Sequence, residues 1–336
     1  MNFRCAKRRR AAVAATLMSG VLVLGACSSD GDDSGGSTLG SQDGAIREFE
    51  AFNGTVEIPV HPQRIVALGS AQTYLDLGVR PVGLGPKATP SQYSWLSEEQ
   101  KKANDEAEDL GEEVNYDKIA SLEPDLIVVN EPEHVLSGDS YDEGRLQSIA
   151  PTVFSETNMS EWQAQSERLA DAVDELDNFN EAKSEYSALV DDVQSEFGDL
   201  LESTDFTFLN SWSGSTGGEF AVEYAHSYCS AYASDAGLNI VPTSPDGEDG
   251  PGASQSIETL HDTVKDSDVL IYPLGPDGKV KPEFAPVLDD ALWRSLPQVI
   301  DNKAFGVQCN QGVTYDDQLG NMKSLKKALE QLTDER

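Results

Sequence analysis

One long amphipathic segment, residues 179–202, constrains the fold of this chain more than any other feature. Its apolar residues recur every three or four positions from Phe179 to Leu200, which predicts one continuous helix with a single apolar stripe. At a rise of about 1.5 Å per residue, such a helix is about 35 Å long, the width of a small domain. Similar patterns of short apolar runs and helical segments lie on each side of it. We therefore predict that the helix connects two lobes.

The two flanking regions repeat the same order of elements after an opening hairpin at residues 46–58. The predicted strands are 64–68, 81–85, 126–129 and 152–154 before the long helix, and 206–209, 239–241, 269–272 and 304–307 after it. The predicted helices beside these strands are 71–77, 141–149, 224–236, 288–295 and 323–332. Apolar strands that alternate with helices are typical of parallel sheets covered on both faces. The predicted fold class is therefore α/β, with two Rossmann-like lobes of parallel-rich sheets, joined by one long helix, and a ligand cleft between the lobes.

The acidic composition excludes one class of partner. The chain has 24 basic and 59 acidic residues and a net charge of −35. Five of the basic residues lie in residues 1–26, which contain no acid, so the rest of the chain is more acidic still. Such a surface repels phosphate backbones, and we expect no nucleic-acid partner.

The first 27 residues have the pattern of a targeting segment. A basic run at residues 7–10 precedes an apolar stretch at 11–25, which is too short for a comfortable membrane span. It ends in Leu-Gly-Ala-Cys27, which resembles the lipobox of bacterial lipoproteins. That resemblance implies cleavage before Cys27, its lipidation, and anchoring on the extracytoplasmic face of the cell membrane. The alternative is an ordinary signal peptide followed by a chance cysteine.

These features divide the chain into five predicted parts. The segment after Cys27 is rich in Ser, Gly and Asp, which favours a flexible tether. The parts are a signal peptide at 1–26, a tether at 27–44, an N-terminal α/β lobe at 45–160, a helical connector at 161–203, and a C-terminal α/β lobe with a terminal helix at 204–336.

Two cysteines, Cys229 and Cys309, remain in the body of an exported protein, where disulfides persist. We favour a disulfide between them over two buried free thiols. We expect no metal site, because neither cysteine belongs to a paired CxxC motif and the histidines form no ligand cluster.

Three motifs in the first lobe resemble those of periplasmic-binding-protein-like receptors for iron–siderophore ABC importers. They are the runs at residues 58–68 with 77–83, at 119–128, and at 149–153, in that order. The first run also occurs in cobalamin and haem receptors. The resemblance implies two lobes joined by a single long helix. It also implies a monomeric, non-enzymatic receptor without a cofactor, which captures an iron(III) complex whose iron is held by the siderophore.

The same resemblance implies protein partners. A receptor of this class delivers its ligand to an ABC permease driven by a cytoplasmic ATPase, and it docks through one acidic residue on each lobe. Glu258 occupies the expected motif in the C-terminal lobe, and Asp142 or Glu143 is the counterpart in the N-terminal lobe.

Loops at the carboxyl ends of the predicted strands supply the candidate ligand-binding residues. Aromatic side chains with a few polar groups suit a bulky ligand that is partly apolar. The candidates are Ser70, Gln72, Lys87, Tyr93, Trp95, Asn130 and His134 in the N-terminal lobe, and Trp212, Phe220, Tyr224, His226, Tyr272, Gln308 and Asn310 in the C-terminal lobe.

The charge of these loops predicts the ligand class. Receptors of this kind commonly place arginines in the cleft for anionic catecholates or carboxylates, but these loops contain no arginine, and Lys87 is the one base among them. We therefore favour a neutral or cationic hydroxamate complex.

Two alternative functions stay open. The first is a haem receptor of the same fold, in which His134 with Tyr224 or His226 would ligate the iron. The second, more distant, is an exported hydrolase, since Ser211, Ser213 and Ser215 lie near His226 in sequence. The G-x-S-x-G elbow of such enzymes is absent from the sequence.

Overall fold

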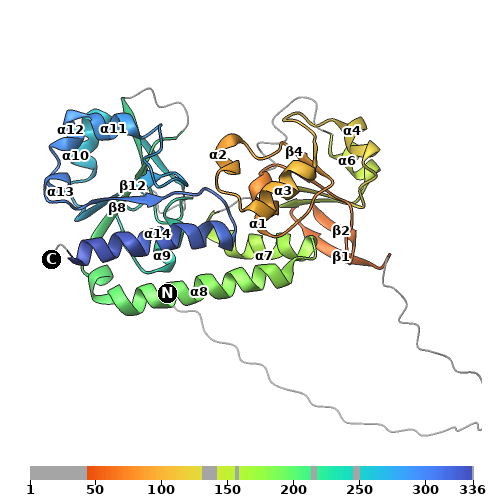
Figure 1. The fold of residues 1–336 in the computed structure, drawn as a ribbon, viewed down its shortest axis with the longest axis horizontal. Coiled ribbons are helices and arrows are strands. Elements are labelled where there is room, and N and C mark those ends of the chain that lie inside the picture. The colour runs from red at the N-terminus through yellow and green to blue at the C-terminus, as the bar shows by residue number, and fades with distance from the viewer. Residues whose placement is uncertain (1–43, 131–141, 156–158, 213–217, 245–249, 335–336) are drawn as a thin grey trace, which may run out of the picture. The chain divides into compact units, whose positions relative to one another are not determined.

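The computed structural model describes residues 44–130, 142–155, 159–212, 218–244 and 250–334 (Figure 1). Asp43–Arg336 form one compact unit, which contains every element discussed below. The predicted signal peptide, the lipidation site at Cys27, almost all of the tether, and His134 lie outside the described residues. Among the helices that are described, none is long and apolar enough to cross a bilayer.

The N-terminal sheet has five parallel strands in the order β5-β4-β3-β6-β7. The antiparallel hairpin of β1 (Ile46–Ala51) and β2 (Gly54–Pro59) precedes it, as the sequence predicts. The central strand β3 is buried along its whole length, as its apolar sequence requires. The sheet strands are β3 (Ile65–Leu68), β4 (Gly83–Gly85), β5 (Glu108–Asp109), β6 (Leu126–Asn130) and β7 (Thr152–Ser155). The helices are α1 (Ala71–Asp76), α2 (Pro90–Tyr93), α3 (Glu98–Glu106), α4 (Tyr116–Ser121) and α6 (Glu143–Ile149).

The C-terminal sheet has the order β11-β9-β8-β12-β13, and β10 pairs with β8. The strands β8, β10, β12 and β13 are parallel, whereas β9 runs antiparallel to both β8 and β11. The strands are β8 (Asp205–Asn210), β9 (Glu219–Glu223), β10 (Asn239–Ile240), β11 (Gly252–Ser256), β12 (Val269–Leu274) and β13 (Ala304–Gln308). The helical segments are α9 (Ala231–Asp235), η2 (Ile257–Thr259), α10 (Leu260–Thr263), α11 (Ala285–Asp289), α12 (Ala291–Arg294) and α13 (Pro297–Ile300).

The helix predicted at residues 224–236 is wrong over its first half. Residues 224–230 form turns, and only α9 is helical. The turn is fixed by tertiary hydrogen bonds: the Cys229 N–H donates to the Glu223 carboxylate, and the Ser230 hydroxyl donates to the Tyr224 carbonyl. Such contacts override local helix propensity.

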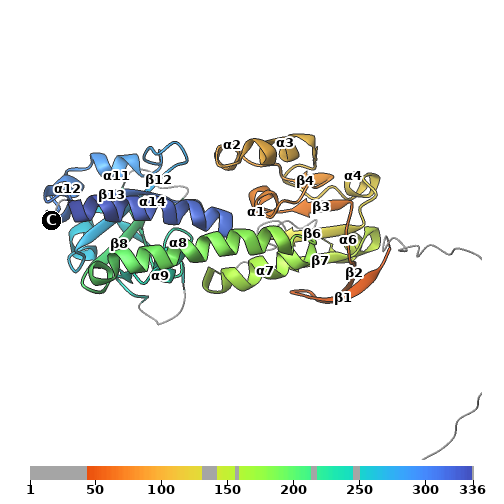
Figure 2. The same ribbon diagram turned by 60° about the horizontal axis from the view of Figure 1, so that its bottom comes forward.

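One long helix runs from one sheet to the other, and a second long helix lies beside it (Figures 1 and 2). After η1 (Met159–Glu161) and α7 (Trp162–Ala172), the predicted connector is α8 (Leu176–Glu202), three residues longer at its start than predicted. Its buried residues include Phe179, Tyr186, Val193 and Phe197, all on the predicted stripe. The terminal helix α14 (Tyr315–Asp334) starts eight residues before the predicted one and lies beside α8.

One hydrophobic cluster runs through both halves of this unit. It includes Ile65 of β3, Val193 of α8, Phe206 of β8 and Met322 of α14. At its centre, the Tyr315 ring lies 4.8 Å from that of Trp162 and 5.3 Å from that of Phe179, measured between centroids. The α/β fold class with parallel-rich sheets is therefore confirmed, and a shared apolar core joins the two lobes through the connecting helices.

Candidate functional site

A cavity of about 1070 Å³ lies between the two sheets and is lined by residues of both lobes. Ser70 follows β3, Asn210 ends β8, Gly275 follows β12 and Cys309 follows β13. These are the carboxyl ends of parallel strands, where ligands of open α/β sheets bind. The N-terminal lining is Ser70, Gln72, Gln92, Ser94 and Trp95, and the C-terminal lining includes Asn210, Ser211, Trp212, Tyr228, Lys279, Lys281, Asn310 and Gln311.

Five of the predicted ligand-binding residues line this cavity: Ser70, Gln72 and Trp95 from the N-terminal lobe, and Trp212 and Asn310 from the C-terminal lobe. Trp95 and Trp212 are both half-buried, so part of each side chain is exposed. The arrangement offers two aromatic surfaces with amide and hydroxyl groups between them.

Other predicted residues support the cavity or lie outside its lining. Asn130 is buried and accepts a hydrogen bond of 2.7 Å from the Ser70 N–H, so it holds the loop after β3. Lys87 and Tyr93 both turn to Asp105, at 3.1 Å from its carbonyl and its carboxylate, respectively. The Gln308 amide nitrogen lies 3.5 Å from the Pro276 carbonyl oxygen, and Gln308 is not one of the lining residues.

Three aromatic predictions are corrected by the packing of the C-terminal lobe. Phe220 of β9 packs in a hydrophobic cluster of the C-terminal lobe and is 1% exposed. Tyr272 stacks on Phe284, with ring centroids 6.3 Å apart, and Tyr224 packs against the same cluster. These aromatic side chains stabilise the lobe, and none of them lines the cavity.

His226 lines a different cavity, of about 1020 Å³, between α7 and the segment before α9. That cavity also contains Asp235, whose carboxylate accepts hydrogen bonds from Tyr186 at 2.7 Å and Gln163 at 3.0 Å. Helices rather than strand ends form most of its wall. His226 therefore does not contribute to the cleft between the sheets.

The loop after β12 carries charges that the sequence prediction missed. Asp277, Lys279, Lys281 and Glu283 all line the cavity. The premise that Lys87 is the one base at the cleft is therefore wrong. The signal was present in the sequence, because residues 275–283 follow a predicted strand at its carboxyl end, as the chosen loops do.

Each of these lysines has acidic neighbours. The Lys279 ammonium lies 2.7 Å from the Asp277 carboxylate. Burial lowers the pKa of Lys281, whereas the charges of Glu223 and Glu283 oppose that shift. The lining therefore contains two cations and two anions, with a third carboxylate beneath it.

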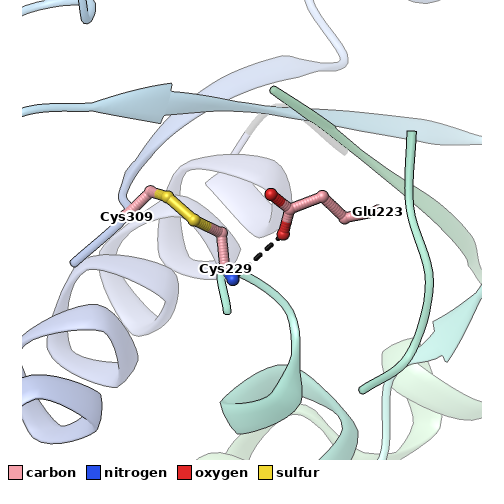
Figure 3. Close-up of side chains that lie close together, drawn as sticks. All are labelled: Glu223, Cys229 and Cys309. Carbon is pink, nitrogen blue, oxygen red and sulfur yellow. Dashed lines mark hydrogen bonds between the residues drawn. A yellow bond between two sulfur atoms is a disulfide. The ribbon is translucent and has the colours of Figure 1, made fainter. Parts of the chain in front are cut away.

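That third carboxylate, Glu223, is buried beside the disulfide (Figure 3). The structure joins Cys229 to Cys309, as we predict from the sequence, with their Cα atoms 5.0 Å apart. Glu223 accepts a hydrogen bond of 2.9 Å from the Cys229 N–H and another from the Asn210 amide. Burial raises its pKa. Both sulfurs lie near this carboxylate, but in a disulfide they are not the thiolates that bind metals.

The candidate docking acids differ in exposure. Glu258 is exposed in η2, at the start of a helical segment. Asp142 is exposed and caps α6 by accepting a hydrogen bond of 3.2 Å from the Arg145 N–H. Glu143 is partly buried and accepts hydrogen bonds from Asn53 at 3.2 Å and Gln147 at 2.7 Å. Asp142 and Glu258 therefore present the more accessible carboxylates.

Known proteins are similar to this chain in sequence and in fold. The chain is 32% identical over 188 residues to the "Probable siderophore-binding lipoprotein YfiY" of Bacillus subtilis, covering 55% of this chain and 55% of the relative. It is 32% identical over 142 residues to the "Iron(3+)-hydroxamate-binding protein YxeB" of the same organism, covering 41% of this chain and 40% of the relative. The chain thus spans about half or less of the length of these two relatives.

A solved structure has the same fold over most of the chain. The siderophore periplasmic binding protein from the fuscachelin gene cluster of Thermobifida fusca matches with a TM-score of 0.67 and 23% identity, covering 82% of this chain and 98% of that one. At this identity the match shows the fold alone. The family model described as "Periplasmic binding protein" matches residues 65–306, from β3 to β13. Proteins of this family are binding proteins, not enzymes. The chain belongs to the periplasmic binding protein family.

Proposed function

We propose that this protein is a lipid-anchored extracytoplasmic receptor that binds a ferric siderophore and delivers it to an ABC permease and its ATPase. The observation that carries the proposal is the cavity of about 1070 Å³ with Trp95 and Trp212 on opposite lobes and amides between them. A ferric siderophore is bulky, partly apolar and rich in hydrogen-bonding oxygens, and such a lining suits it. The printed names of YfiY and YxeB, one for siderophores and one for iron–hydroxamates, support the same ligand class.

A neutral or cationic hydroxamate complex remains the favoured ligand, on a corrected physical basis. The cleft does contain lysines, but Asp277 neutralises Lys279, and Glu223 and Glu283 face Lys281. An anionic complex would have to displace these carboxylates from the lysines, or it would face their negative charges with no free cation among the described lining residues to offset the repulsion. The strongly acidic chain adds a repulsive field for anions.

The proposed anchor and docking sites rest on the sequence motifs. Cys27 would carry the lipid, and Glu258 with Asp142 or Glu143 would contact the permease. Exposure favours Asp142 over Glu143 as the contact on the N-terminal lobe. A reversal of charge at Glu258, with unchanged ligand affinity, should lower iron uptake by cells.

The test of ligand class is a tryptophan-quenching titration of the full chain. Trp162 and Trp293 are buried in the core, whereas Trp95 and Trp212 line the cleft. Ferric desferrioxamine B, a cationic hydroxamate complex, should quench saturably, and Trp95→Phe with Trp212→Phe should remove most of the signal. Saturable quenching by an anionic tris-catecholate complex alone would refute the hydroxamate class, and quenching by haem alone would refute the siderophore proposal.

The haem alternative loses most of its predicted ligands. Tyr224 and His226 do not line the cavity, and His134 lies outside the described residues. Tyr228 is the tyrosine that lines the cavity. A Soret band that appears on haem addition and is lost in Tyr228→Phe would revive this alternative.

A further inference from the structure

We propose that Asp317 and Asp76 form an acid-pair clasp, which ties the two lobes together beneath the cleft and orients one ligand-facing amide from each lobe. The effect on ligand affinity rests on the proposed function, whereas the clasp itself can be tested without a ligand. Asp317 lies in the first turn of α14, and Asp76 ends α1 of the N-terminal lobe.

The amides of Gln72 and Asn310 meet at one carboxylate oxygen. Both side chains line the cavity, Gln72 from the N-terminal lobe and Asn310 from the C-terminal lobe. Each donates a hydrogen bond to Oδ1 of Asp317. Gln72 is 4% exposed, Asn310 8% and Asp317 2%, so water does not compete freely for these bonds. With one N–H engaged, each amide keeps a second N–H and a carbonyl oxygen as hydrogen-bonding groups.

The second oxygen of Asp317 connects to the N-terminal lobe. The Thr314 hydroxyl lies 2.9 Å from Asp317 Oδ2 and 3.0 Å from Asp76 Oδ2. The same hydroxyl therefore brings the Oδ2 atoms of the two acids close to each other. Gln100 of α3 completes the site, because its amide donates to Asp76 Oδ1 at 2.8 Å. The carboxylate of Asp317 is thus surrounded by donors from both lobes.

The carboxylate of Asp317 packs directly against the backbone at Gly312. A Cβ atom at Gly312 would lie 1.4 Å from Asp317 Oδ2, so any other residue there would displace it. Asn310 is itself fixed, because its N–H donates to Asn321 at 2.8 Å and its carbonyl accepts from Asn321 at 2.9 Å.

The clasp favours a proton on one of the two acids, because the Thr314 hydroxyl has a single hydrogen for two facing Oδ2 atoms and two adjacent buried anions repel each other. Burial and the facing charge of Asp317 raise the pKa of Asp76 well above its usual value, and burial raises the pKa of Asp317 to about 6. We therefore assign the proton to Asp76, which donates to the Asp317 carboxylate.

Other charged groups face the pair from two packed elements. Asp316 of α14 raises the pKa of both acids by repulsion. Asp316 in turn faces Glu181 and Glu185 of α8, and Lys323 of α14. When pH rises through the pKa of Asp76, two anions face each other beneath the cleft, and the clasp loosens.

The test compares two variants of the full chain with a control. Asp76→Asn keeps an N–H donor toward Asp317 but cannot ionise. Asp317→Leu removes the acceptor shared by Gln72 and Asn310. Asp199→Asn, exposed on α8, removes one negative charge elsewhere. Thermal unfolding between about pH 5 and 9 is measured without ligand, followed by titration with ferric desferrioxamine B.

In the wild type, the native state holds a proton that the unfolded chain releases above about pH 4, so this contribution to stability falls as pH rises through the pKa values of the pair. Asp76→Asn should flatten the fall relative to both the wild type and Asp199→Asn. Asp317→Leu should lower Tm by about 5 °C or more across the range. The same variant should also bind ferric desferrioxamine B at least tenfold more weakly than the wild type. Asp76→Asn should keep its affinity for this complex at high pH.

A pH dependence that is the same in Asp76→Asn and the wild type would overturn the clasp. So would an Asp317→Leu variant with unchanged Tm. If ferric desferrioxamine B binds neither the wild type nor the variants, the proposed function fails. The stability measurements made without ligand still test the clasp in that case.

Discussion

The Thr314 hydroxyl, at the start of α14, lies 3.0 Å from the Asp76 carboxylate at the end of α1. Thr314 is 1% exposed, so this contact between lobes is shielded from water. We predict that Thr314→Val lowers the free energy of unfolding by about 1–3 kcal/mol, because the carboxylate that accepts from this hydroxyl loses its donor. Thr263→Val is the matched control, since Thr263 donates at an exposed site within one lobe. Equal effects of the two substitutions in chemical denaturation would contradict a structural role for the contact.

The aromatic cluster around Tyr315 should contribute more. Its ring packs edge to face on Trp162 and Phe179, at the junction of α7, α8 and α14. Tyr315→Ala should lower the free energy of unfolding by about 3–5 kcal/mol, through lost burial and a cavity. Tyr315→Phe keeps the ring and should cost less than about 1 kcal/mol. A large loss in Tyr315→Phe would show that the hydroxyl, rather than ring packing, carries the effect.

The disulfide closes a long segment of the C-terminal lobe. Cys229 and Cys309 are 80 residues apart in sequence, which corresponds to a constraint on the unfolded chain of about 4 kcal/mol. The double variant Cys229→Ser with Cys309→Ser should lose about 2–4 kcal/mol. The same loss should follow from reducing the wild type, and reductant should leave the double variant unchanged. Thiol labelling checks that the disulfide has been fully reduced. If the free energy of unfolding of the fully reduced wild type equals that of the oxidised protein, the prediction is contradicted.

The balance of charge in the loop after β12 should set ligand preference. Asp277 neutralises Lys279 at 2.7 Å, at the edge of the cavity. Asp277→Asn should therefore raise the affinity for an anionic tris-catecholate complex by about three- to tenfold. It should lower the affinity for cationic ferric desferrioxamine B. Asp289→Asn, which changes the charge outside the cavity lining, is the control. Identical changes for both ligands would argue against local charge complementarity.

The shared apolar core and the long connector predict a small closing motion. The cluster that contains Ile65, Val193 and Phe206 runs without interruption from one sheet to the other. Small-angle scattering profiles of the empty and loaded protein should therefore be nearly identical. A marked compaction on loading would show that the lobes are joined more loosely.

Much of the fold could be predicted from the sequence. The apolar stripe from Phe179 to Leu200 predicts α8, and the short apolar runs predict the parallel strands, because both depend on local periodicity. The strands β9 and β11 were missed. Their residues pair with each other across an intervening segment, and Gly252–Ser256 has little apolar character of its own.

The site was less predictable, for physical reasons that differ between residues. The rule of strand ends located Ser70, Trp95 and Trp212, but it cannot tell an aromatic residue in the lining from one in the core, such as Phe220. Asp317 gave no signal at all. Its role depends on partners 245 residues away, at Gln72, and on the absence of a side chain at Gly312.

Calorimetric titration of ferric desferrioxamine B into the full chain tests most directly whether this cleft binds ferric siderophores. We predict one-to-one binding with a Kd of about 1 µM or tighter, weaker binding of the iron-free ligand, and at least a tenfold loss of affinity in Trp212→Ala. Absence of binding to any ferric siderophore, or an affinity that Trp212→Ala and Trp95→Ala leave unchanged, would contradict the assignment of ligand and cleft.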